Sequence, residues 1–149
     1  MIKKIIFVLI PVLTTALWLT SCCTPCNQSS PKIEDLESAT WTMIELNNNP
    51  IENSPITVHF NPNDKMLNGT ALCNNFFAGY HLLTPKKGSH QNIEFLNVGA
   101  TMKYCPDMEL EQTFTRLLPT IKQVKIEGEH LVMINGGDSL MAVFVRAKM

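Results

Sequence analysis

Five cysteines carry the most reactive side chains of this chain, and three of them stand within residues 22–26. Cys23-Thr24-Pro25-Cys26 has the C-x-x-C spacing of thiol-disulfide enzymes, in which one thiol attacks and the second resolves the mixed disulfide. That chemistry needs a scaffold in which a helix begins at the motif directly after a strand. Here the motif follows an uncharged run at residues 5–19 and precedes a polar stretch at residues 27–31. We therefore expect no redox or metal chemistry from this cysteine pair.

The beginning of the chain has the three-part pattern of a secretory signal peptide. Lys3 and Lys4 supply a positive start, and the apolar run at residues 5–19 follows them. That run is shorter than the ~20 apolar residues that a helix needs to span a bilayer. A basic start, a short apolar run and small or polar residues at a cleavage point are typical of a cleaved signal. We expect residues 1–21 to be this signal.

The end of the signal, Leu-Thr-Ser-Cys at residues 19–22, resembles the lipobox of bacterial lipoproteins. The resemblance implies a palmitate-type lipid on Cys22, with residues 22–38 as a lipidated N-terminus and flexible linker. Two or three acyl chains hold a protein stably at a bilayer. Cys23 stands where an aspartate would favour inner-membrane retention in enteric bacteria, so the outer membrane is the expected location, facing the periplasm or the cell surface. An ordinary cleaved signal and an uncleaved anchor are the alternatives.

The charge of the remaining chain argues against nucleic acid as a partner. The whole chain has 12 basic and 13 acidic residues, and residues 1–21 contain two of the basic ones and none of the acidic ones. The remaining 128 residues (149 − 21) therefore have ten basic against thirteen acidic side chains, a net charge of −3. Nucleic-acid binding usually requires a basic patch. A chain of this length is large enough for one domain with its own core.

Alternating apolar and polar residues from residue 39 onward predict a chain of short β-strands. One stretch has a helical period instead, because Leu110, Phe114, Leu117 and Leu118 would form one apolar stripe. We expect this helix over residues 106–119. The expected fold is mainly β, a compact antiparallel β-barrel-like domain of seven or eight strands with one packed helix over residues 39–149. The expected strands are 40–47, 55–60, two short strands or a bulged hairpin within 65–83, 92–101, 121–128, 130–135 and 139–147.

Cys73 and Cys105 are the two cysteines inside this domain. An even pair in an exported chain favours a structural disulfide. Two free buried cysteines remain an alternative, and so does a catalytic Cys73 with His59 or His81 as its base. His59 falls on the polar face of its strand, which favours a solvated surface position. No metal or other cofactor is expected, because the four histidines show no ligand spacing and the methionines are scattered.

Four stretches of the domain together resemble the META domain, also called the HslJ-like domain, of bacterial envelope proteins. They are Trp41, residues 68–80 (NGTALCNNFFAGY), residues 101–106 (TMKYCP), and the acidic helix start ahead of Phe114. The residues that match the family motif are Trp41, Gly69, Asn74, Phe76, Gly79, Tyr80, Thr101, Met102 and Pro106.

Three residues depart from the family pattern. Leu72 stands where the family often has glycine, Phe77 alters the usual spacing, and Tyr104 replaces a small residue before Cys105. The resemblance still implies a compact β-barrel-like domain with one helix, on envelope-anchored proteins linked to stress tolerance. No reaction is established for the family at large.

The polar residues of these motifs have structural interpretations beside functional ones. Asn74 and Asn75 could hold a substrate, but asparagines in sharp turns usually satisfy backbone groups. Asp107, Glu109 and Glu111 could do acid–base work, but carboxylates at a helix start are explained by the helix dipole. The aromatic motif residues could line a pocket, but aromatics at strand spacing usually form the core.

Two functions from different classes fit these features. The favoured one is a non-enzymatic envelope lipoprotein that contacts another protein, a glycan or the membrane, in envelope stress tolerance. The alternative is a small-molecule-binding barrel with an aromatic-lined pocket beside residues 73–80. A protease inhibitor, which would need an exposed rigid loop such as residues 84–91, is a remoter alternative.

Overall fold

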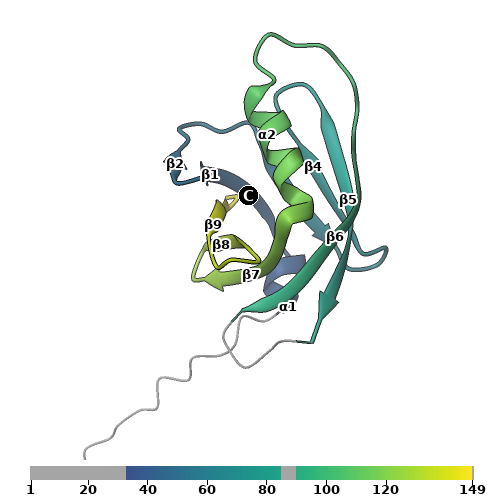
Figure 1. Ribbon diagram of the computed structural model, residues 1–149, viewed down its shortest axis with the longest axis vertical. Helices are drawn as coiled ribbons and strands as arrows, with labels where there is room; N and C mark the ends of the chain where they lie inside the picture. The colour runs from purple at the N-terminus through teal and green to yellow at the C-terminus, as the bar shows by residue number, and fades with distance from the viewer. Residues whose placement is uncertain (1–32, 85–89, 149) are drawn as a thin grey trace, which may run out of the picture.

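The computed structural model describes residues 33–84 and 90–148. Cys22, Cys23, Cys26 and the predicted signal peptide lie outside the described residues. The described chain forms nine strands, two α-helices and one 3₁₀ turn (Figure 1). The elements in chain order are α1 Ile33–Glu37, β1 Thr40–Leu46, β2 Asn49–Pro50, β3 Thr57–Asn61, β4 Met66–Thr70, β5 Asn75–Leu83, β6 Gln91–Ala100, α2 Glu109–Leu117, η1 Leu118–Thr120, β7 Ile121–Glu127, β8 His130–Asn135 and β9 Leu140–Arg146.

The strands close into an antiparallel barrel. Consecutive strands from β3 to β9 pair with one another, and β1 pairs with both β3 and β9. The closing pair runs from Trp41 opposite Arg146 to Leu46 opposite Ala142. Eight strands therefore make the barrel, and the two-residue β2 adds to the edge of β1.

The predicted fold class is confirmed. The bulged hairpin expected within residues 65–83 is β4–β5, with a bulge between Phe77 and Gly79 on the side facing β6.

Helix α2 fills an opening in this barrel. β6 and β7 pair only through Gln91 opposite Val124 and Asn92 opposite Gln123, so the rest of β6 diverges from β7. Figure 1 shows α2 lying between β6 and the β7–β9 strands. Phe114 of α2 packs edge-on against Phe76 of β5 at 5.4 Å and Phe144 of β9 at 5.6 Å between ring centroids. The helix thus completes the core that the strands leave open.

Large aromatic side chains fill the barrel interior. Six of them are at most 1% exposed, and edge-to-face contacts of the Phe60–Tyr80 kind, at 5.3 Å between centroids, join several of them. Such side chains fill the interior as the core residues of other proteins do. The six are Trp41, Phe60, Phe76, Tyr80, Phe114 and Phe144.

The predicted flexible linker ends earlier than residue 38. Ile33–Glu37 form the short helix α1, and the Leu36 side chain is 1% exposed. The indole Nε1 of Trp41 donates a hydrogen bond of 3.1 Å to the Leu36 carbonyl. Burial of one leucine and this bond attach α1 to the barrel. Neither contact is visible in the alternation of apolar and polar residues that predicts the strands.

The predicted helix at residues 106–119 is also shorter than expected. α2 begins at Glu109, with Met108 as its N-cap and no side-chain cap bond, and Pro119 lies in the 3₁₀ turn after it. The segment before α2 is held by Cys105 instead, whose N–H donates to the Met108 sulfur at 3.4 Å. Phe114 and Leu118 of the predicted stripe are buried, and Leu110 and Leu117 are half-buried.

A polar network attaches α1 to the barrel wall. Lys65 and the Tyr80 hydroxyl both donate to Oε1 of Glu37, Lys65 at 2.7 Å. Burial alone would raise the pKa of Glu37, but the hydrogen bonds from Lys65 and Tyr80 and the Lys65 charge hold it below its ordinary value. Burial and the bond to Glu37 raise the pKa of Tyr80, which therefore stays protonated well above neutral pH.

This network predicts a specific loss of stability in acid. Because the pKa of Glu37 is lowered by folding, its contribution is present above the unfolded value of 4.5 and is lost as pH falls below it. Glu37→Gln should lower the free energy of unfolding at pH 7 by about 1 kcal/mol and flatten its decline in acid. Urea titrations between pH 3 and pH 7, at about one-unit steps around the carboxylate range, measure this. Glu34→Gln changes an exposed position of the same helix and is the control. If the free energy of unfolding declined equally in acid for both variants, the assignment to Glu37 would be contradicted.

Candidate functional site

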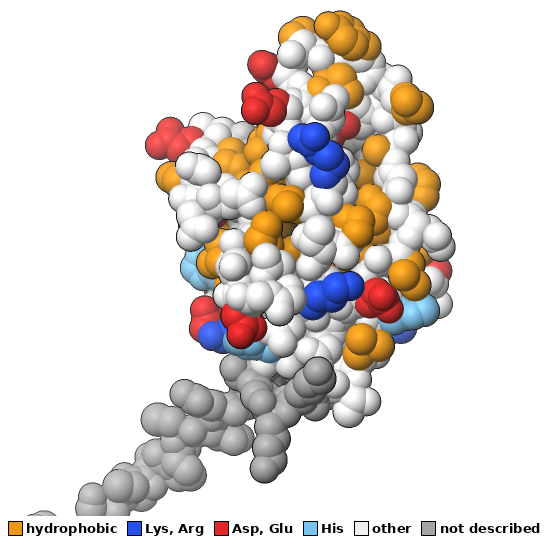
Figure 2. Space-filling model, viewed as in Figure 1, with side chains coloured by type: hydrophobic (Ala, Val, Ile, Leu, Met, Phe, Trp, Pro, Cys, Tyr) orange, Lys and Arg blue, Asp and Glu red, His pale blue; other side chains and the backbone are white. Residues whose placement is uncertain are grey.

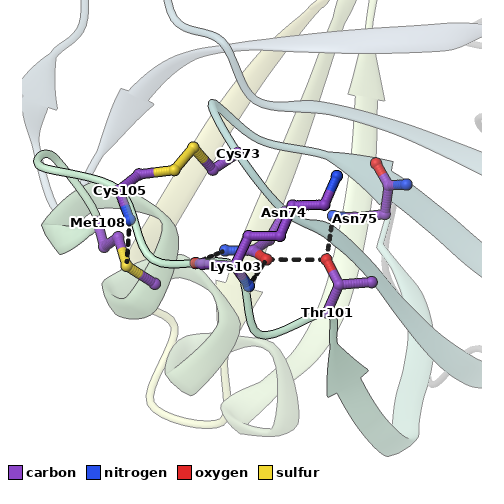
Figure 3. Close-up of a disulfide and its surroundings, with 7 residues drawn as sticks. All are labelled: Cys73, Asn74, Asn75, Thr101, Lys103, Cys105 and Met108. Carbon is purple, nitrogen blue, oxygen red and sulfur yellow. Dashed lines mark hydrogen bonds between the residues drawn. A yellow bond between two sulfur atoms is a disulfide. The ribbon is translucent and has the colours of Figure 1, made fainter.

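The two domain cysteines meet at one end of the barrel. The sulfurs of Cys73 and Cys105 lie within disulfide-bonding distance, with Cα atoms 6.4 Å apart, inside the usual range for disulfides. The pair joins the β4–β5 connection to the segment between β6 and α2 (Figure 3). The fold thus brings together the cysteines of two motif stretches that are 32 residues apart.

Asn74 attaches the same two segments through its side chain. Its Oδ1 accepts hydrogen bonds from the Lys103 N–H and the Thr101 hydroxyl, both at 2.8 Å, and its Nδ2 donates to the Lys103 carbonyl at 3.1 Å. The side chain is only 1% exposed, and Figure 3 shows it directed at residues 101–103. Asn74 therefore satisfies backbone groups, as expected, but those of a distant segment and not of its own turn.

Thr101 adds to this attachment from the other side. Its hydroxyl accepts from the Asn75 N–H at 3.1 Å while it donates to Asn74, and its own N–H donates to the Asn75 carbonyl at 2.9 Å. The bonds of Thr101 to Asn74 and Asn75 and the Cys73–Cys105 pair join the same two segments, 73–75 and 101–105. Together they hold the segment 101–108, which has neither helix nor strand, against the barrel.

The motif glycines have two different roles. A Cβ on Gly69 would lie 2.0 Å from the ring of Phe76, its cross-strand partner, so this position accommodates only glycine. Gly79 follows the bulge in β5, where an added Cβ would meet only ordinary contact with the Leu96 carbonyl at 3.6 Å. The close approach of two strands is therefore at Gly69, and the bulge of β5 is beside Gly79.

The remaining motif residues separate into core and surface. Trp41, Phe76 and Tyr80 are part of the barrel core, while Met102 and Pro106 are exposed. The motif therefore does not form a single cleft. Its polar members fasten one loop, and its aromatic members fill the interior.

The loop that these bonds fasten presents large apolar side chains to solvent. Met102 is 98% exposed, Tyr104 is 92% exposed, and Leu72, beside Cys73, is 57% exposed. We call these three residues the apolar tip. Figure 1 places the β6–α2 connection at the end of the barrel opposite α1, and Figure 2 shows hydrophobic side chains gathered at that end (Figure 2). Leu72 and Tyr104 are two of the three departures from the family pattern; the third, Phe77, is 44% exposed.

Both histidines that could serve as the base of a catalytic Cys73 are exposed on strands, His59 on β3 and His81 on β5. His59 is exposed, as its strand pattern predicted, and its Nδ1 lies 3.1 Å from the Ala39 carbonyl oxygen. His81 is exposed on β5.

Within residues 33–84 and 90–148, no group of three or more histidine, cysteine or acidic side chains is arranged to hold a metal ion. In the same residues no helix is long and apolar enough to cross a membrane.

One of the three carboxylates at the start of α2 differs from expectation. Asp107 and Glu109 are exposed, in keeping with a role near the helix dipole, but the Glu111 side chain is 5% exposed. Its Oε2 has no hydrogen-bond partner among the described residues. The signal was present in the sequence, because Glu111, Phe114 and Leu118 are spaced i, i+3 and i+7 on one helix face.

Comparisons with known proteins agree with this architecture. The family model of the META domain matches residues 34–148. No curated protein matches the chain.

Two solved structures illustrate the fold. The NMR structure of a protein from Burkholderia xenovorans is similar at 15% identity and a TM-score of 0.59, over 78% of this chain and 86% of that one. A crystal structure of a DUF4847 family protein from Bacteroides vulgatus is similar at 12% identity and a TM-score of 0.58, over 78% and 99% of the two chains. At such identities the similarity concerns the fold alone.

Proposed function

This chain belongs to the META domain family, and we propose that it is an envelope lipoprotein that acts by contact through its apolar tip and not by catalysis. The lipid on Cys22 would anchor it to the outer membrane, and the contacted component would be another protein or a glycan of the envelope. A role in envelope stress tolerance accords with the resemblance that the sequence has to its family.

The observation that carries this proposal is the exposure of Met102 and Tyr104. Large apolar side chains that gather on the surface of a folded protein are typical of interaction sites, and these two stand two residues apart on one loop. Here they are also held in place, by the Cys73–Cys105 pair and the Asn74 hydrogen bonds. A pre-ordered loop loses less conformational entropy on binding than a free one does.

The position of the tip supports contact at a distance from the anchor. The described chain begins with α1, and the tip lies at the other end of the barrel (Figure 1). An acyl anchor on the N-terminal side of α1 would therefore be joined to the end of the barrel opposite the tip. This arrangement favours a partner in the space beyond the anchoring bilayer over the anchoring lipid itself.

The alternative function, a small-molecule-binding barrel, is supported less well. Its pocket would be lined by aromatic side chains, but Trp41, Phe60 and Tyr80 pack inside the barrel with at most 1% exposure. The hollow beside Phe76 and Phe77 lies on the outer face of β3, β4 and β5. A catalytic Cys73 is likewise disfavoured, because its sulfur is within bonding distance of Cys105.

Site-specific photocrosslinking in intact cells tests this proposal. A benzophenone amino acid in place of Tyr104 should give a reproducible adduct with one envelope component, because that side chain is exposed at the tip. The same amino acid in place of His81, also exposed but outside the tip, should not give this adduct. The Tyr104 adduct should disappear when Cys22→Ser releases the protein from the membrane. Equal adducts from positions 104 and 81, or none from either, would count against contact through the tip.

A further inference from the structure

A groove runs along the first turns of α2. It consists of two hollows, with volumes of ≈ 420 Å³ and ≈ 290 Å³, that share Ile51, Asp107 and Leu110 as lining residues. We call their union the α2 groove. Its other lining residues are Leu46, Asn47, Asn49, Glu52, Pro55, Ile56, Ala71, Leu72, Glu109, Glu111 and Thr113.

The α2 groove combines an apolar surface with charge of one sign. Leucine and isoleucine side chains from β1, the 51–56 segment and α2 line much of it. Its charged lining residues are all acidic: Glu52, Asp107, Glu109 and Glu111. Figure 2 shows acidic and hydrophobic side chains close together near β2 and the start of α2. A groove with this lining suits a ligand that is cationic at one point and apolar along its length.

Glu111 gives this groove a specific unsatisfied group. Its side chain is 5% exposed, it lines the smaller hollow, and its Oε2 has no hydrogen-bond partner among the described residues. A buried carboxylate without a partner destabilises a fold, because it has lost its hydration without replacement. A cation with N–H donors would supply both the missing charge and the missing hydrogen bond.

We propose that the α2 groove binds a primary alkylammonium group, with the ammonium at the Glu111 carboxylate and the methylene chain over Ile51 and Leu110. An ammonium has three donors and tolerates a site with several acidic oxygens. The methylene chain accounts for the apolar lining, which a bare metal ion would leave unused. The groove shares Leu72 with the apolar tip, but the proposal uses neither Met102 nor Tyr104, and it does not depend on the membrane anchor.

Two sources would present this chemistry. One is a free diamine or polyamine, and the other is the side chain of a lysine in a partner polypeptide. Both place an ammonium at the end of a methylene chain, the chemistry that the lining of the α2 groove suits. The experiment below therefore has an arm for each.

The test is a titration of the full-length protein in detergent micelles, followed by NMR of ¹³C-labelled isoleucine and leucine methyl groups. The ligands are 1,5-diaminopentane and a lysine tripeptide with blocked ends, with pentan-1-ol and the matching norleucine tripeptide as uncharged controls. At least one ammonium ligand should bind saturably and shift the methyl signals of Ile51 and Leu110. Tighter binding of the diamine indicates a free amine, and tighter binding of the tripeptide indicates a partner lysine.

Matched variants test whether Glu111 binds the ammonium group. Glu111→Gln keeps the shape of the side chain and should weaken binding about tenfold or more. Asp107→Asn, at the exposed rim, should weaken it about threefold through its smaller electrostatic contribution, and it keeps the test valid if Glu111→Gln does not fold. Glu94→Gln, outside the groove on β6, should leave the affinity unchanged. Absence of saturable binding by the wild-type protein, or equal affinity in the Glu111 and Glu94 variants, overturns the proposal.

Discussion

Replacing Cys73 and Cys105 together by serine should lower the free energy of unfolding by about 3–4 kcal/mol. The two residues are 32 positions apart, so their bond closes a loop of 32 + 1 = 33 residues. Closing a loop of that length removes conformational entropy from the unfolded chain, and the estimate follows from this loss. Since a domain of this size has a total stability of only about 5–15 kcal/mol, the bond should account for a large share of it.

Urea unfolding followed by far-ultraviolet circular dichroism measures the effect under oxidising conditions. Cys23→Ser/Cys26→Ser is the matched control, because this second cysteine pair belongs to the predicted linker and should change nothing. The double variant at 73 and 105 should also lose protection against amide exchange first at residues 101–108, the segment that the bond fastens. A loss of stability below about 1 kcal/mol would show that the bond is absent or unimportant.

Asn74→Ala should lower the free energy of unfolding by about 3 kcal/mol, an effect well beyond that of an ordinary polar-to-alanine change. The substitution removes three hydrogen bonds and leaves the N–H and carbonyl groups of Lys103 without their partners. Since Asn74 is 1% exposed, water replaces those bonds poorly. The Lys103 amide should lose its exchange protection in this variant, even under conditions in which the barrel stays folded.

The neighbouring asparagine supplies the control for this prediction. The described hydrogen bonds of Asn75 use only its backbone atoms, and its side chain is exposed. Asn75→Ala should therefore change the stability by less than about 0.5 kcal/mol. Similar losses from both substitutions would mean that the Asn74 side chain does not fasten the 101–103 segment.

The barrel strands were predictable because their period is local. In β3, the buried Val58 and Phe60 alternate with the exposed or half-buried Thr57 and His59, and such alternation is visible in the sequence alone. The closure of the barrel was not predictable in this way. It depends on β1 pairing with β9 across almost the whole domain, and a single sequence contains no local record of that contact.

The predicted ends of the linker and of the helix were wrong where tertiary contacts determine them. α1 lies in a stretch expected to be a flexible linker, and it is ordered by burial of Leu36 and by the Trp41 indole bond. α2 begins three residues after the expected start, because the Cys105 attachment keeps residues 106–108 outside the helix. The cysteine pair was visible in the sequence, but its effect on the start of α2 was not, and the Leu36 and Trp41 contacts have no signature within residues 33–37.

The residues of the candidate site were predictable from the sequence, but the roles of those residues were not. The motif pointed to Asn74 and Thr101, yet their partnership across 27 positions appears only in the fold. The helix dipole predicts an exposed Glu111, but its spacing of three residues from Phe114 places it on the buried face of α2. The exposure of Met102 and Tyr104 had no sequence signal, because apolar residues beside a cysteine would ordinarily be expected in the core.

Mass spectrometry of the protein isolated from native membranes tests the central claim, that a lipid-anchored and disulfide-fastened module presents the tip. After alkylation of free thiols and digestion without reduction, the first peptide should begin at Cys22 and carry acyl chains. A second species should contain the peptides of Cys73 and Cys105 still joined. An unacylated N-terminus together with alkylated Cys73 and Cys105 would contradict both the anchor and the fastening of the loop.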